Sequence, residues 1–121
     1  MTDRTAQTHL LLETTLAHAL TYLDDMTERR VPPSATAEQL LATFGAELPD
    51  GPSDPVAVID DLVAAAEPGL AALASPRFFG FVNGGTYPVS IAADWLTSVW
   101  DQNVGLREVT PAHSAARDVV E

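Results

Sequence analysis

The sequence predicts a mainly α-helical chain with little or no β-sheet. Apolar residues recur at intervals of three and four in several segments, which is the spacing of one face of an α-helix. Prolines stand between these segments or at their first positions, where they end or begin helices. One dense apolar run, in residues 77–86, is too continuous for a half-exposed strand.

The first and longest helix is predicted in residues 5–29. Its apolar residues form one stripe along the helix, and these are Leu12, Leu16, Ala19, Leu20, Leu23 and Met26. Polar residues, including Glu13, Thr21 and Asp24, occupy the other side. Pro32 and Pro33 end the helix because proline has no amide donor and restricts the residue before it.

The second helix is short and is predicted to begin at Thr36. Thr36 and Gln39 have the spacing of a capping box, in which each side chain satisfies a free backbone amide of the first turn. Gly45 is the expected C-terminal stop. Leu40, Leu41 and Phe44 are expected to form the apolar face.

The third helix is predicted to open at Asp54, after a proline-rich loop in residues 48–55. Pro55 takes the first helical position, where its missing amide has no cost. Its expected buried face consists of Val56, Ile59, Leu62, Val63 and Ala66. Pro68 and Gly69 are expected to kink or end this helix.

Residues 77–86 are predicted to be extended or irregular. Most of their apolar side chains, namely Phe78, Phe79, Phe81 and Val82, are expected to be buried. The six aromatic side chains of this part of the chain are interpreted as core residues rather than a binding platform, and these are Phe78, Phe79, Phe81, Tyr87, Trp95 and Trp100.

Two helices are predicted in the last third of the chain. The fourth begins at Pro88 and continues to Asp101, with Ile91, Ala92, Trp95, Leu96, Val99 and Trp100 at helical spacing. The fifth opens at Pro111, and the sequence ends within it without a stop signal. This pattern predicts a truncated chain, and a helix end that simply frays is the alternative.

The composition limits the class of protein. With 121 residues the chain forms at most one domain, and its hydrophobic content of 46% argues against disorder. Its 17 acidic and 6 basic residues give a net charge of −11, which disfavours binding to nucleic acid or to an anionic membrane surface. The acidic residues are interpreted as a solvated face.

The absence of cysteine excludes disulfides and thiolate chemistry, and the lack of a signal peptide or a long apolar stretch predicts a cytoplasmic protein.

The titratable residues do not form a recognisable catalytic or metal motif. His9 and His18 lie nine residues apart, too far for ligands at adjacent turns of a helix, and His113 stands alone. Adjacent aspartates such as Asp60 and Asp61 point in different directions on a helix and cannot converge on one bond. No catalytic or metal-binding residue is therefore predicted.

Asn83, Gly84, Gly85 and Thr86 form the remaining candidate site. Two glycines allow the backbone to approach a ligand closely, and the helix that follows offers free amides to an anion. The same residues also suit a purely structural loop between the aromatic run and the fourth helix. From these residues alone, both interpretations stay open.

Residues 77–85, with the order Arg-Phe-Phe-Gly-Phe-Val-Asn-Gly-Gly, resemble the group II pyridoxal-phosphate-dependent amino acid decarboxylases. That family contains the aromatic amino acid, histidine and glutamate decarboxylases. The resemblance continues in residues 92–96, Ala-Ala-Asp-Trp-Leu, and in residues 100–103, Trp-Asp-Gln-Asn. Residues 22–33 and the pair Pro68 and Gly69 also fit the family pattern. The resemblance covers nearly the whole chain and is most specific in its last third.

The resemblance implies the N-terminal helical segment of a fold-type I enzyme with pyridoxal 5'-phosphate as cofactor. Residues 1–74 would be a helical segment that clasps the partner subunit of a homodimer, and residues 75–121 the substrate-side loop and the truncated start of the large cofactor-binding domain. The activity implied is that of a lyase, a carboxy-lyase that removes carbon dioxide from an amino acid substrate. The substrate-side residues implied are Phe79, Phe81, Asn83, Gly84, Gly85 and Thr86.

The chain contains no lysine, although the family holds its cofactor covalently on a lysine amine. The family's lysine, its ring-stacking histidine and its phosphate-binding loop all lie beyond the region that this chain resembles. The chain alone is therefore expected to be inactive and to hold no cofactor covalently. The alternative hypothesis is a self-standing acidic helical module that binds other proteins without catalysis.

Overall fold

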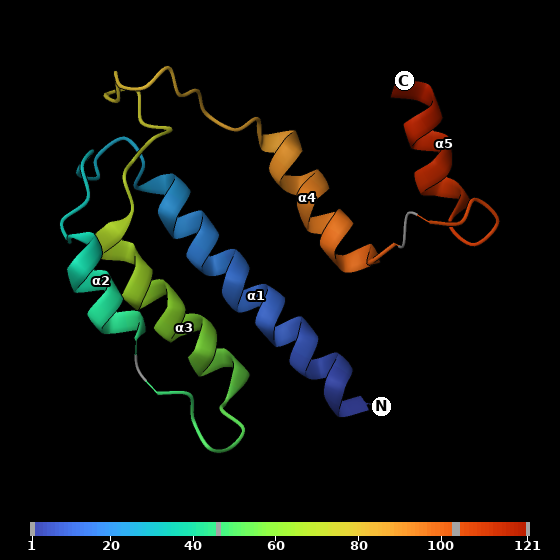
Figure 1. Ribbon diagram of the computed structural model, residues 1–121, viewed down its shortest axis with the longest axis horizontal. Coiled ribbons are helices and arrows are strands. Elements are labelled where there is room, and N and C mark those ends of the chain that lie inside the picture. Colours follow the sequence, from blue (N-terminus) through green and yellow to red (C-terminus); the bar gives the residue numbers. More distant parts are fainter. Residues whose placement is uncertain (1, 46, 103–104, 121) are drawn as a thin grey trace. The chain divides into compact units, whose positions relative to one another are not determined.

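The computed structural model describes residues 2–45, 47–102 and 105–120. Within these residues the chain has five α-helices, one short 3-10 helix and no strand, so the mainly α-helical prediction is confirmed (Figure 1). The chain divides into two compact units, Met1–Gly85 and Thr86–Glu121. Among the described helices, none combines the length and the apolar character needed to cross a membrane.

Helix α1 (Thr2–Asp24) begins three residues earlier and ends five residues earlier than the sequence predicted. After Asp24 the backbone tightens: the amide of Met26 donates to the carbonyl of Leu23, and the amide of Arg29 to that of Asp25. These turns bury Met26 and lead the chain into its two prolines. The predicted C-terminal boundary was wrong because bonds over three residues, from Met26 to Leu23 and from Glu28 to Asp25, interrupt the regular ladder after Asp24.

Helix α2 (Ala37–Phe44) has the predicted capping box. The Gln39 amide donates to Oγ1 of Thr36 at 3.3 Å, and the Thr36 amide donates to Oε1 of Gln39 at 2.8 Å. Gly45 closes the helix with a bond from its amide to the carbonyl of Leu41 at 2.8 Å. Side-chain caps thus set the start of this short helix, and a backbone bond of Gly45 marks its end.

Helix α3 (Pro55–Ala66) also begins as predicted. Oδ1 of Asp54 accepts the Val56 amide at 3.0 Å, and Pro55 occupies the first turn. The helix then continues into the 3-10 helix η1 (Glu67–Gly69), in agreement with the expected break at Pro68 and Gly69. Because a Cβ atom on Gly69 would lie 2.3 Å from Cδ1 of Leu40, the glycine lets α2 approach η1 closely.

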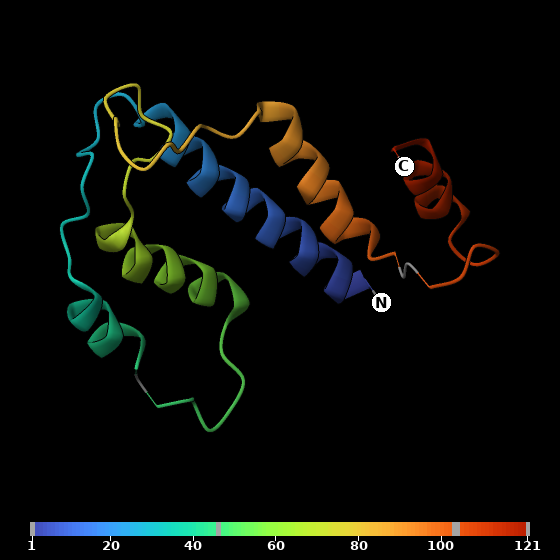
Figure 2. The same ribbon diagram turned by 45° about the horizontal axis from the view of Figure 1, so that its top comes forward.

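The three helices of the first unit form one small layer. Helix α3 runs beside α1 and α2 beside α3 in both views (Figures 1 and 2). The half-buried residues of α1 are Leu11, Thr14, Thr15, His18, Ala19 and Tyr22. The expected apolar stripe is largely a different face, because Leu12, Leu16, Leu20 and Leu23 are exposed. The leucines of α1 therefore remain available for contact.

The expected burial of the other apolar faces was partly wrong. Leu41 and Phe44 of α2 and Leu62 of α3 are exposed, although Leu40, Val56, Ile59, Val63 and Ala66 are half-buried. The physical reason is the size of the layer: α2 has only eight residues and covers one side of α3. In the described residues, the buried apolar side chains are Met26 and Ala72.

Backbone hydrogen bonds join the segment after α1 to the segment after α3. The amides of Ser34 and Ala35 both donate to the carbonyl of Pro68, at 2.8 and 2.9 Å. The amide of the buried Ala72 donates to the carbonyl of Val31 at 3.0 Å. We call this set of contacts the corner, and it fixes where the chain enters residues 75–85.

The second unit contains α4 (Pro88–Trp100) and α5 (Pro111–Val120), which begin at the two predicted prolines. Asp101 ends α4 in the left-handed conformation, with φ of 45°. Nη1 of Arg107 lies 2.6 Å from Oδ2 of Asp118, so an ion pair holds the turn before α5 against that helix. The apolar residues of α4 are exposed, apart from the half-buried Ile91 and Trp95.

The capping box of α2 provides a first test. Hydrogen bonds from its own backbone amide and from the Thr36 hydroxyl hold the pKa of Glu38 below its ordinary value. Replacing Thr36 by alanine should reduce the free energy of unfolding by about 1 kcal/mol, measured by urea unfolding. The pKa of Glu38, followed by NMR titration, should rise toward its ordinary value.

The sign of the pH effect follows from the lowered pKa. The charged Glu38 stabilises the folded chain above the ordinary carboxyl pKa, and this contribution is lost as the pH falls through the lowered value. Thr43→Ala is the control, because that hydroxyl only donates to the carbonyl of Gln39 within the helix. Equal losses in both variants would contradict the role of the cap.

Candidate functional site

The residues that the sequence singled out lie in an exposed loop. Phe79 is 94% exposed, Phe81 is 90% exposed and Val82 is fully exposed, so the expected burial of the aromatic run was wrong. Phe78 is half-buried. No other described segment covers these side chains, and the loop presents an apolar surface to solvent.

The loop is folded on itself by a tight turn around Gly80. The rings of Phe78 and Phe81 lie 6.5 Å apart, and the amide of Asn83 donates to the carbonyl of Gly80 at 3.4 Å. A Cβ atom on Gly80 would lie 3.1 Å from Cζ of Phe78, so a larger residue would require the ring to shift by a few tenths of an ångström. Phe81 and Val82 both have φ of 55°.

A left-handed conformation is costly for these two residue types, about 1–2 kcal/mol each. Such conformations persist where the surrounding structure requires them, and they concentrate at ligand-binding and switch regions. Asn83, Gly84 and Gly85 complete the loop and are exposed, and a Cβ atom on Gly84 would meet no atom within 4 Å. Thr86 belongs to the second unit and is also exposed.

The base of the loop is held more firmly than its tip. Ser75 is buried, its hydroxyl accepts the Arg77 amide at 3.2 Å, and its carbonyl accepts the Phe78 amide at 3.0 Å. Nη2 of Arg77 donates to the backbone carbonyl of Arg29 at 2.5 Å. The loop therefore starts from a point fixed against the end of the first helical segment.

Arg29 joins the elements around that point. Its guanidinium lies over the ring of Tyr22, 4.3 Å from the ring centroid, and forms an ion pair with Glu67 of η1. The Arg29 side chain is only 10% exposed, so this pair is less screened by solvent than a surface pair. One residue thus links α1, η1 and the base of the loop.

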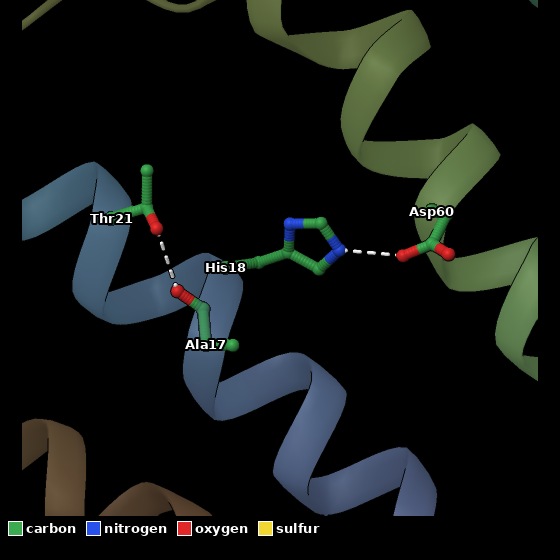
Figure 3. A network of polar contacts seen from close by, with 4 residues as sticks. All are labelled: Ala17, His18, Thr21 and Asp60. Carbon is green, nitrogen blue, oxygen red and sulfur yellow. Dashed lines mark hydrogen bonds and ion pairs between the residues drawn. The ribbon is translucent and has the colours of Figure 1, made fainter.

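His18 and Asp60 form a contact that the sequence did not predict. Nε2 of His18 in α1 lies 2.7 Å from Oδ1 of Asp60 in α3, and both side chains are partly exposed (Figure 3). A histidine oriented by a carboxylate is one component of a general-base pair. The two residues are 42 positions apart, so no local spacing could reveal the contact.

A groove of about 540 Å³ lies between α1 and α3. Apolar side chains such as Tyr22, Leu62 and Val63 line most of it, and His18 and Arg29 stand at its polar positions. The side chains of His18 and Arg29 contact Asp60 and Glu67, respectively. The described residues contain no group of three or more histidine, aspartate or glutamate side chains that could hold a metal ion. The groove has the character of a contact surface.

The His18–Asp60 pair provides a second test. Asp60→Asn should lower the free energy of unfolding by about 0.5 kcal/mol, because polar contacts between partly exposed side chains contribute little. The matched control is Asp61→Asn, which removes the same charge from the adjacent position of α3. We expect no loss in the control. A loss several times larger in Asp60→Asn, measured by urea unfolding, would contradict the view of a minor surface contact.

The sequence motifs singled out above do not come together in one site. Residues 100–103 include Asn103, which lies outside the described residues. Phe79, Phe81, Asn83, Gly84 and Gly85 share one loop, and this grouping is the candidate site. Comparison of the chain with models of protein families, with curated proteins and with solved structures finds no match.

Proposed function

We propose that this chain is the N-terminal region of a pyridoxal-phosphate-dependent group II amino acid decarboxylase. In this proposal it contributes homodimer contacts and the substrate-side loop of a cytoplasmic carboxy-lyase, and it is incomplete on its own. The observation that carries the proposal is the loop that resembles the family's. It holds two exposed aromatic side chains, Phe79 and Phe81, and its backbone is left-handed at Phe81 and Val82.

A loop of this kind suits one wall of a binding site. Exposed aromatic rings offer an apolar surface that excludes water once a second wall faces it. The glycines at 84 and 85 leave space for close approach of a ligand to the backbone. In the proposed enzyme, Phe79 and Phe81 would contact the amino acid, with Asn83, Gly84, Gly85 and Thr86 beside it.

The exposed leucine stripe of α1 supports the proposed dimer contact. Leu12, Leu16, Leu20 and Leu23 lie on one side of a 23-residue helix and are exposed. Apolar stripes of this length are typical of surfaces that another element covers. In the proposal the partner subunit covers them.

The residues of this chain do not fit the cofactor itself. Pyridoxal phosphate supplies the electron sink for decarboxylation and is held on a lysine, and the sequence has none. We therefore assign no chemical step to this chain. Its own residues would orient the substrate and exclude water.

The second candidate function is a self-standing acidic helical module that binds other proteins. The observation that favours it is the complete local structure of the first unit. Both α2 and α3 have satisfied N-terminal caps, and the corner closes with backbone bonds, without any further domain. Under this alternative, the same exposed leucines would contact an unrelated partner.

The cofactor provides the direct test of the proposed function. The native polypeptide that contains these residues is isolated from its source, incubated with pyridoxal phosphate and reduced with borohydride. We expect a pyridoxyl-lysine in a peptide outside residues 1–121, and release of carbon dioxide from an amino acid before reduction. The 121-residue chain should give neither result. A native polypeptide that retains no cofactor and releases no carbon dioxide would refute the decarboxylase proposal.

The leucine stripe provides a separate test of the dimer contact. Leu20→Gln should cost the isolated chain about 1 kcal/mol or less, because the side chain is already half exposed. In the native polypeptide the same change should weaken self-association about tenfold, measured by sedimentation. Leu41→Gln on α2 is the matched control and should leave the association unchanged. Equal effects of the two variants on association would place the contact elsewhere.

A further inference from the structure

We propose that Arg77 is a positioning residue that sets the direction in which the loop of residues 78–85 extends from the corner. The contact responsible is the hydrogen bond from its guanidinium to the backbone carbonyl of Arg29. The identification of this loop as a substrate-side wall rests on the proposed function. The positioning role itself rests only on the contacts of this chain.

The position of Arg77 in the hydrogen-bond pattern supports this role. Up to Ser75 the backbone is held by the corner, through the bond of Ala72 to Val31 and the turn from Ala72 to Ser75. Beyond Phe78, the described hydrogen bond of the loop is internal, from Asn83 to Gly80. Among the described contacts, the Arg77 side chain makes the last polar contact between the loop and a distant segment. Without the bond from Arg77 to Arg29, the loop would be joined to the corner mainly by its covalent backbone.

An arginine suits this contact for two reasons. Its guanidinium is always charged and carries several N–H donors in a fixed plane, so its bond to a carbonyl is charge-assisted and directional. The acceptor is also available, because the carbonyl of Arg29 lies beyond the end of α1 and outside its ladder of hydrogen bonds.

The acceptor residue extends the effect to the helices. Through its side chain, Arg29 contacts Tyr22 of α1 and Glu67 of η1, and through its carbonyl it holds Arg77. The Glu67 carboxylate compensates the charge of Arg29, which allows a second guanidinium to bind the same residue. The direction of the loop is therefore coupled to the packing of α1 against the end of α3.

The chain contains no cysteine, so labels can be attached at chosen positions to measure the direction of the loop. Cysteines introduced at Glu13 on α1 and at Asn83 in the loop carry spin labels, and the distance distribution between the labels is measured by pulsed electron paramagnetic resonance. A second pair, at Glu13 and Asp61, reports on α1 and α3 alone. Each label pair is introduced into the full 121-residue chain in four backgrounds: the original sequence, Arg77→Met, Arg77→Lys and Arg107→Met.

We expect Arg77→Met to raise the population of displaced loop conformations about tenfold, the factor for losing one hydrogen bond to a charged group. The Glu13–Asn83 distribution should broaden, whereas the Glu13–Asp61 distribution should stay narrow. Arg77→Lys should restore part of the narrow distribution, because lysine keeps the charge and a donor. Arg107→Met, which removes an exposed ion-paired arginine of the second unit, should leave both distributions unchanged.

Two results would overturn the proposal. The first is a Glu13–Asn83 distribution that keeps its width in Arg77→Met. The second is equal broadening of the Glu13–Asp61 pair, since Arg77 would then support the helices rather than direct the loop. The outcome is independent of the decarboxylase proposal: a native polypeptide without cofactor would refute that function and leave the measured loop direction valid.

Discussion

The first unit depends on the corner where the segment after α1 meets the segment after α3. Two amides, of Ser34 and Ala35, share the carbonyl of Pro68, and Ala72 bonds to Val31. Few apolar side chains are buried in the first unit. The relative positions of α1 and α3 therefore depend on these backbone bonds and on the ion pair of Arg29 with Glu67. The base of the candidate loop starts at Ser75, directly after this corner. The position of the candidate loop thus depends on backbone hydrogen bonds more than on packing of apolar side chains.

The same structure explains why so much apolar surface remains exposed. A layer of three helices, one of them only eight residues long, can bury few apolar side chains within itself. Leu12, Leu16, Leu20 and Leu23 of α1 and Phe79 and Phe81 of the loop are among the exposed apolar side chains. Under the proposed function, the partner subunit and the remainder of the enzyme cover them. The left-handed residues Phe81 and Val82 would then be held in place by contacts that this chain alone does not make.

The sequence predicted those features that depend on neighbouring residues. The cap of α2 by Thr36, the start of α3 at Asp54, and the starts of α4 and α5 at prolines all follow from interactions over three or four positions. Burial was predicted poorly, because it depends on which elements cover a face, and here several faces have no cover. The bond of Arg77 to Arg29 and the pair of His18 with Asp60 join residues more than 40 positions apart, so no periodicity could indicate them. The left-handed turn at Phe81 and Val82 contradicts the preference of both residue types, and a residue pattern therefore argues against it.

Differential scanning calorimetry of the isolated 121-residue chain tests most directly whether the chain is part of a larger folded unit. A self-contained globular chain of this length would unfold in one cooperative transition with an enthalpy of roughly 85 kcal/mol near 60 °C. We predict a broad transition with less than about half of that enthalpy, since the uncovered apolar faces contribute little packing. A single sharp transition near the full enthalpy would contradict this account and support the self-standing module.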